Sequence, residues 1–228
     1  QDRPGRPVAE AAAIALLDLP EQAGRHARSI LQALAQRFGP GPETGLLQLL
    51  GLFHRRARQP EMAALREAPT VPGLNDGLAG LGEAAWMQLV NRLRRLRLLS
   101  AEDPNDVEAI DAHPLVREHF AESLRLGDPQ AWRIGNLRLF QHLQASCPPY
   151  PETLAEMQPL LEAVVHGCKA GCHQQALNLH YLRAQRGGNV NYVESALGAY
   201  GSNLAVFAHL FDKPWSQPAQ GLSTQAAV

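Results

Sequence analysis

The stretch RLLSAEDPNDVEAIDAHPLVREHF, residues 97–120, decides the fold of this 228-residue chain. It starts with Arg97-Leu-Leu99, passes through a polar turn, and returns through Val107 to Asp111, whose residues alternate in polarity. This order predicts two short strands joined by a polar turn. Pro114 then opens a helix that we expect to reach about Leu126, since proline is favoured in the first helical turn.

Helical patterns lie before this hairpin. Apolar residues three and four apart predict helices beginning near Glu43 and Pro60, and a longer helix from Glu83 to Leu96. Three helices, a two-stranded wing and a further helix make the layout of a winged helix. We therefore predict a winged-helix domain over residues 43–127.

Residues 128–211 show a series of helical stripes separated by short turns. This pattern favours an α-solenoid of TPR-like helical hairpins, each pair burying its apolar stripe on the next. The expected helices cover about Pro129 to Gln144, Pro151 to Ala170, His173 to Arg186 and Tyr192 to Phe211.

The two ends of the chain are predicted to be simpler. Residues 1–42 form a linker and a helical segment, with helices at about Val8 to Asp18 and Glu21 to Phe38, because Gly39-Pro-Gly-Pro42 ends the second helix. Residues 212–228 hold two Pro, a Trp and small polar residues, and are expected to be a C-terminal connector.

The composition favours a mainly α fold. Thirty-five Leu and thirty-four Ala stand against eleven Val, four Ile and four Thr. Unbranched residues favour helices, whereas β-branched residues favour sheets. With 45% hydrophobic and 19% charged residues, the chain can bury a core, which excludes a disordered tail. An all-β fold is excluded as well.

Charge and cysteine content bear on partners and compartment. The formal net charge is −1, so no global field draws the chain to nucleic acid or anionic lipid. No apolar run reaches the ~18 residues that cross a bilayer. Three cysteines are too few for a disulfide framework and indicate a reducing, cytoplasmic setting. Because the chain begins with Gln1 and shows no signal-peptide pattern, we expect a processed or excised piece of a longer protein.

Motifs of common enzymes are missing from the sequence. G-x-x-x-x-G-K-[ST] does not occur, and Gly39-Pro-Gly-Pro-Glu-Thr-Gly45 has no Lys and too much Pro to cradle a phosphate. G-x-S-x-G and H-E-x-x-H are missing too. The chain by itself is therefore predicted not to be an enzyme and to hold no cofactor.

The segment His166-Gly-Cys168-Lys-Ala-Gly-Cys172-His173 brings two thiols and two imidazoles together, as zinc sites do. The expected turn separates the two cysteines onto successive helices, and no second pair at finger-like spacing completes a ligand set. We therefore predict no metal, and instead a helix corner with buried small residues.

Four arginines lie on and just after the third predicted helix of the winged helix, where a DNA-binding version places its major-groove contacts. Acidic residues surround them, and a solvated or interdomain arginine face is the commoner arrangement. Contact with DNA is therefore an alternative role, and nucleic acid is not the expected partner. The four residues are Arg92, Arg94, Arg95 and Arg97.

His113 stands at the junction between the second predicted strand and the helix that Pro114 opens. Backbone N–H groups and the helix dipole favour an anion there, and an imidazole can donate a hydrogen bond to a phosphate oxygen. The simpler interpretation is a histidine that caps the helix without a ligand.

The segment Ala112-His113-Pro114-Leu115-Val116-Arg117 resembles the end of the winged-helix domain in NB-ARC and related STAND nucleotide-switch ATPases. The family motif there is Met-His-Asp followed by Leu-hydrophobic-Arg. Pro114 departs from it by standing where the motif has Asp. Further stretches resemble bacterial members that join this ATPase to helical repeats, in one consistent order within about residues 24–222. These stretches are 45–53, 93–99, 166–171, 197–204 and 211–215.

The resemblance implies a regulatory and sensor fragment of a signalling or defence ATPase. In such proteins the winged helix closes over bound ADP and the motif histidine contacts the β-phosphate, which implies that role for His113. ADP or ATP with Mg would be bound by the intact parent, through a P-loop module upstream in cis. The helical repeats would bind protein partners, and activation would form an oligomer.

Two other classes of function stay open. A winged-helix transcriptional regulator would use the arginine face of residues 92–97. A scaffold of helical repeats would bind protein alone and would tolerate the loss of both His113 and that face.

Overall fold

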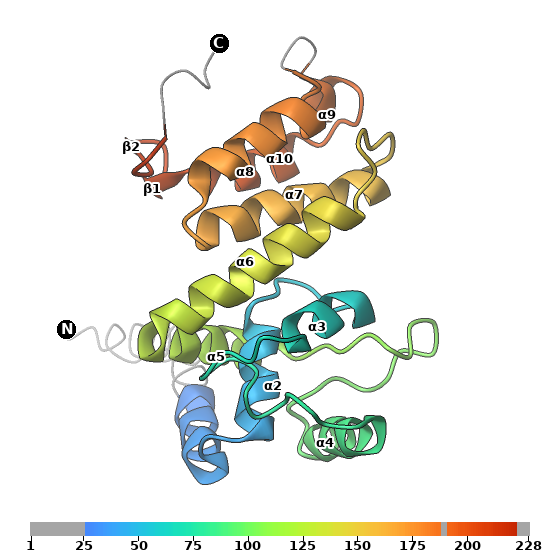
Figure 1. Cartoon of the computed structure of the whole chain (residues 1–228), viewed down its shortest axis with the longest axis vertical. Coiled ribbons are helices and arrows are strands. Elements are labelled where there is room, and N and C mark those ends of the chain that lie inside the picture. Colours follow the sequence, from blue (N-terminus) through green and yellow to red (C-terminus); the bar gives the residue numbers. More distant parts are fainter. Residues whose placement is uncertain (1–25, 188–190, 223–228) are drawn as a thin grey trace, which may run out of the picture.

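The computed structural model describes residues 26–187 and 191–222 (Figure 1). Helices dominate it, which confirms the prediction of a mainly α fold. The predicted helix from Val8 to Asp18 lies outside the described residues, and the next one is present over residues 26–38. Within the described ranges no helix has the length and apolar character that a membrane crossing requires.

The first half of the chain packs around one apolar core. α2 lies at its centre, with Leu46, Leu47 and Leu49 fully buried. α5 crosses α2 so closely that Gly51 lies against the backbone of Ala121. The helices of this half, besides residues 26–38, are α2 (Pro42–Gly51), α3 (Gln59–Arg66), α4 (Glu83–Arg95) and α5 (Pro114–Gly127).

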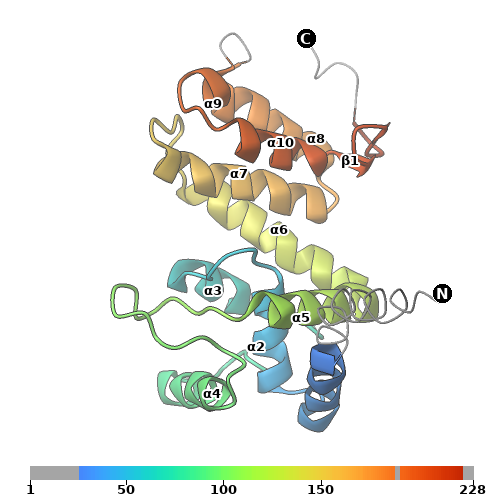
Figure 2. The ribbon, with the colours of Figure 1, turned by 180° about the vertical axis from the view of Figure 1, so that it is seen from behind.

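The second half is a stack of helices with a core of its own, centred on α7, where Leu160 and Val164 have no exposed surface. Figures 1 and 2 show α6 running between the two halves. Leu139 of α6 belongs to the first core and Phe140 to the second, so the two cores meet within this helix. The helices are α6 (Pro129–Ser146), α7 (Leu154–Lys169), α8 (His173–Leu179), the π-helical turn η1 (His180–Ala184), α9 (Tyr192–Ser195) and α10 (Tyr200–Ala208).

Local sequence explains where these helices begin. Proline occupies the first turn of α2, α5 and α6. Asp128 caps α6 by accepting a hydrogen bond from the backbone N–H of Ala131 at 2.9 Å. Thr153 caps α7 by accepting one from Glu156 at 3.3 Å. Each cap satisfies a backbone donor that the helix itself leaves unpaired.

The prediction of two wing strands, at residues 97–99 and 107–111, is wrong, because neither segment forms a regular strand. The chain there is a projecting loop (Figure 2) with the isolated pairs Ala57–Ile110 and Asp103–Asp106. Ser100 N–H donates to Asp111 at 2.8 Å, which closes the base of the loop. Leu98 and Leu99 are both buried, as are Ala109 and Ile110. Successive buried residues do not fit the two-residue period of a half-exposed strand.

The C-terminal part differs from the prediction in two ways. The single helix expected from Tyr192 to Phe211 is broken, because Gly198 adopts a left-handed conformation (φ +64°) between α9 and α10. The expected connector instead begins with an antiparallel pair of strands, β1 (Phe211–Lys213) and β2 (Gln217–Pro218). Trp215 turns the chain between them with φ +62°.

Candidate functional site

His113 is the N-cap of α5, and its side chain is exposed. Its Nδ1 accepts a hydrogen bond from the backbone N–H of Leu115 at 3.2 Å. A ring nitrogen that accepts carries no proton, so the neutral imidazole has its proton on Nε2. The side chain of His113 therefore caps α5. Its Nε2–H is left as a donor for a group outside the helix.

The residues on both sides of His113 fix its position. Arg117, one turn into α5, forms an ion pair with Asp111 in the preceding loop. Ile110 exchanges two backbone hydrogen bonds of 2.8 and 2.9 Å with Ala57. The loop is therefore tied to both the body of the first half and the start of α5.

The four arginines do not form one open basic face. Arg92 and Arg94 make ion pairs of 2.6 and 2.9 Å with Glu43 and with a carboxylate in the loop after α4. Arg95 and Arg97 are exposed. Pairing lowers the positive charge available to phosphates, which weighs against DNA contact by this helix.

The cysteine- and histidine-containing corner is packed into the core. His166 is buried, and its Nδ1 lies 2.9 Å from Oδ1 of Asn136. Burial raises the pKa of the Cys168 thiol to about 12, so the thiol stays protonated at neutral pH. Among residues 26–187 and 191–222, no three His, Cys, Asp or Glu side chains are arranged to hold a metal ion.

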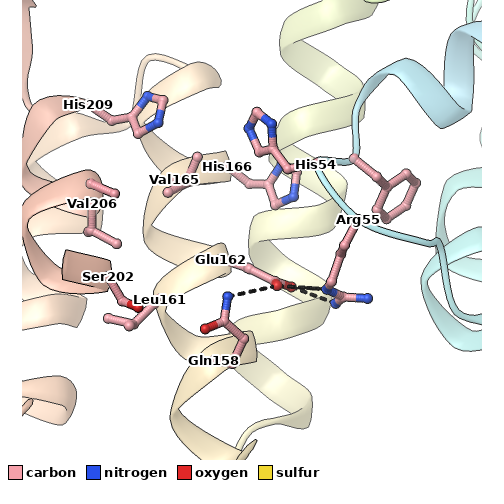
Figure 3. Close-up of a pocket in the computed structure, with 12 residues that line it drawn as sticks. His54, Arg55, Gln158, Leu161, Glu162, Val165, His166, Ser202, Val206 and His209 are labelled. Atoms are coloured by element: carbon pink, nitrogen blue, oxygen red, sulfur yellow. Dashed lines mark hydrogen bonds and ion pairs between the residues drawn. The ribbon is translucent and has the colours of Figure 1, made fainter. Parts of the chain in front are cut away.

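A groove of about 490 Å³ lies between the loop after α2 and the helices α7 and α10 (Figure 3). We call it the junction groove, because residues of both halves line it. Its volume falls in the range of small-molecule sites. Its polar lining residues are His54, Arg55, Gln158, Glu162, His166, Ser202 and His209.

Arg55 links the two halves at one end of the groove. Its Nε donates to both carboxylate oxygens of Glu162 on α7, at 2.6 and 2.8 Å. Its Nη2 donates to Glu61 on α3 at 2.7 Å. Burial lowers the pKa of Arg55, but the hydrogen bonds to these two carboxylates outweigh it and raise that pKa. Arg55 therefore stays charged and holds both acids.

His54 lies at the other end, where it contacts Lys169, a residue that does not itself line the groove. Nζ of Lys169 lies 2.6 Å from Nε2 of His54. Burial lowers the pKa of Lys169 to about 8, and burial together with the Lys169 charge lowers the pKa of His54 to about 4. At neutral pH the lysine is therefore mostly charged, and the histidine is neutral and accepts a hydrogen bond from the ammonium group.

Sequence reasoning missed the junction groove. It singled out His166 only for its place beside two cysteines, and no pattern connected that segment with the other polar residues of the groove. His54 and Lys169 are 115 positions apart, and no local pattern pairs them. One signal was available, since the chain has two lysines and nineteen arginines, and Lys169 is one of the two.

No family model, no curated protein and no solved structure matches this chain. Its function therefore has to be argued from the residues and their geometry.

Proposed function

We propose that this chain is the regulatory part of a nucleotide-switched signalling ATPase of the STAND class, and that the chain itself catalyses no reaction. The observation that carries the proposal is His113, an exposed imidazole at the start of α5 whose Nδ1 caps the helix. Its Nε2–H can donate to a phosphate oxygen, and the helix N-terminus favours the negative charge. The phosphate would be that of ADP held by an ATPase module upstream.

The order of elements supports a winged helix as the unit that carries His113. α2 is followed by the bridging residue Ala57, then by α3 and α4, then by the projecting loop and α5. In the resting state this unit packs over the nucleotide. The TPR-like helices α6 to α10 bind a protein partner in the cytoplasm and favour an open arrangement that assembles into an oligomer. Reversing a 1:99 population needs a preference of about 5.5 kcal/mol.

The test uses two substitutions in the intact polypeptide that carries this chain. His113→Ala removes both the cap and the Nε2–H donor. His113→Asn keeps a good capping side chain but replaces the Nε2–H donor by a shorter amide, whose N–H groups do not reach the same position. We expect both variants to copurify with less ADP than the unchanged protein and to show higher basal activity, with the nucleotide content measured by chromatography after denaturation. An Asn variant that retains ADP normally would reduce His113 to a cap and overturn the proposal.

Two measurements on the chain itself separate the alternatives. We expect no ATP turnover and no nucleotide binding at low-micromolar affinity in calorimetry, because the chain has no P-loop. We also expect no salt-dependent gel shift of random duplex DNA. A shift that disappears in Arg95→Ala/Arg97→Ala would favour a DNA-binding regulator instead. A scaffold of repeats would bind its protein partner equally well with either His113 variant.

A further inference from the structure

Lys169, at the end of α7, forms no ion pair with a carboxylate in the part of the chain that the structure describes. Its Nζ contacts Nε2 of His54 at 2.6 Å and lies 5.8 Å from the ring centroid of Trp132. Both neighbours are uncharged. The imidazole nitrogen accepts a hydrogen bond from the ammonium group, and the indole ring makes a cation–π contact with it. A partly buried cation is normally balanced by an anion, and the described residues supply none here.

Two imidazoles near Lys169, those of His54 and His209, line the junction groove. Because Nε2 of His54 accepts from Lys169, the proton of the neutral ring lies on Nδ1, which is a donor. His209, which directly follows α10, lies across the groove from His54 (Figure 3). Burial lowers the pKa of His209, and the nearby charge of Lys169 lowers it further. Within residues 26–187 and 191–222, no hydrogen bond of the His209 ring competes for a ligand.

The acidic residue of the groove does not neutralise the charge of Lys169. Glu162 accepts hydrogen bonds from Nε and Nη2 of Arg55 at 2.5 to 2.8 Å and from Gln158 at 3.2 Å. Its charge is therefore balanced by Arg55 at the opposite end. The charge at the Arg55 end of the groove is thus compensated, whereas the charge of Lys169, next to the lining residue His54, is not.

We propose that the junction groove binds a carboxylate carried on an apolar body, with the carboxylate beside His54 and His209 and near the ammonium group of Lys169, which contacts His54. One negative charge matches the one ammonium group, and the two neutral imidazoles supply donors. A phosphate is better matched by an arginine fork, and Arg55 is already engaged by Glu162 and Glu61. The apolar body would lie against Phe53, Leu161, Val165 and Val206.

This site goes beyond the proposed switch, because it involves neither His113 nor a nucleotide. Two sources offer the same chemistry: a free organic acid, or the C-terminal carboxylate of a peptide lying along α7 and α10. The residues around the carboxylate would be the same for both, so a comparison of probes distinguishes them.

The test follows the imidazole resonances of the chain by NMR during titration with 4-phenylbutyrate. We expect saturable shifts of His54 and His209 with a Kd of about 1 mM or tighter, as for a ligand of this size. 4-Phenylbutanamide and inorganic phosphate should bind at least about tenfold more weakly, because the first lacks the charge and the second lacks the apolar body. A peptide ending in Leu-Phe, with a free or an amidated C-terminus, tests the second source.

Lys169→Met should weaken the binding of 4-phenylbutyrate at least about tenfold, whereas Lys213→Met should leave it unchanged, because Lys213 is exposed on β1. If Lys169→Met does not fold, ¹³C-methylation of the two lysines gives a second readout in the unsubstituted chain, and the probe should raise the pKa of Lys169. The proposal is overturned if neither the acid nor the peptide shifts His54 and His209, if the amide binds as tightly as the acid, or if the pKa of Lys169 does not respond.

Discussion

Nζ of Lys169 lies 2.6 Å from Nε2 of His54, and this contact joins α7 to the loop that follows α2. Burial lowers the pKa of His54, and the positive charge of Lys169 lowers it further, to about 4. We therefore expect Lys169→Met to raise the pKa of His54, because the neighbouring charge is removed. A histidine NMR titration measures this, with Lys213→Met as the control. An unchanged pKa would mean that burial alone sets it.

Acid should destabilise the protein below about pH 6.5. Burial is the first cause that lowers the pKa of several imidazoles in the folded chain from 6.5. The unfolded chain therefore binds protons that the folded chain does not, so stability is lost as the pH falls from 6.5 towards 4. Urea midpoints at pH 7, 6 and 5 should decrease in that order. The histidines concerned are His54, His119, His166, His180 and His209.

A control identifies one contributor to this pH dependence. His166→Gln can keep a hydrogen bond to Asn136 while removing the most deeply buried titrating imidazole of the groove. We expect the difference between the midpoints at pH 7 and pH 5 to become smaller in this variant. Equal midpoints at the two pH values in the unsubstituted chain would contradict the explanation.

Replacing Arg55 should have a large effect on stability. Its side chain is 26% exposed and pairs with Glu61, which is 4% exposed, and with Glu162. Removing one partner of a buried pair leaves an unbalanced charge, and we expect Arg55→Met to lower the free energy of unfolding by about 3 kcal/mol. Arg55→Met/Glu61→Gln should recover part of that loss, because the orphaned carboxylate is gone.

Arg56→Met is the matched control, since Arg56 forms its ion pair with Asp103 on the surface. Exposed pairs contribute little, so its urea midpoint should stay close to that of the unsubstituted chain. If Arg55→Met and Arg56→Met behave alike, the Arg55 link does not hold the two halves together.

Much of the helical fold could be predicted because its signals are local. Pro114 and Asp128 mark helix starts by fixing φ or by accepting a backbone hydrogen bond, and both effects act within four residues. The break at Gly198 and the hairpin around Trp215 were missed for a physical reason. Gly198 stands in a sequence that otherwise continues a helical stripe, and strands of two or three residues are too short to show an alternating pattern.

The groove could not be predicted, because its chemistry depends on tertiary contacts. Lys169, His54 and His209 belong to three segments that are distant in sequence, and their pKa shifts arise from burial and from one another. His113 was found because its features, an N-cap beside a proline, are sequential. Sequence reasoning thus located one exposed donor and missed the cluster that packing brings together.

The crossing of α2 and α5 gives a sharp test of the packing in the first half. A Cβ added at Gly51 would lie 2.5 Å from the backbone nitrogen of Ala121 and 2.8 Å from its Cα. Backbone atoms cannot rotate away as a side chain does, so the two helices would have to separate. We expect Gly51→Ala to lower the free energy of unfolding by about 2 kcal/mol, although alanine is the better helix former.

Gly127→Ala in α5 is the control, because nothing lies within 4 Å of its added Cβ, and it should be neutral or slightly stabilising. Urea unfolding of both variants decides the matter, and equal stabilities would show that α2 and α5 do not cross this closely in solution.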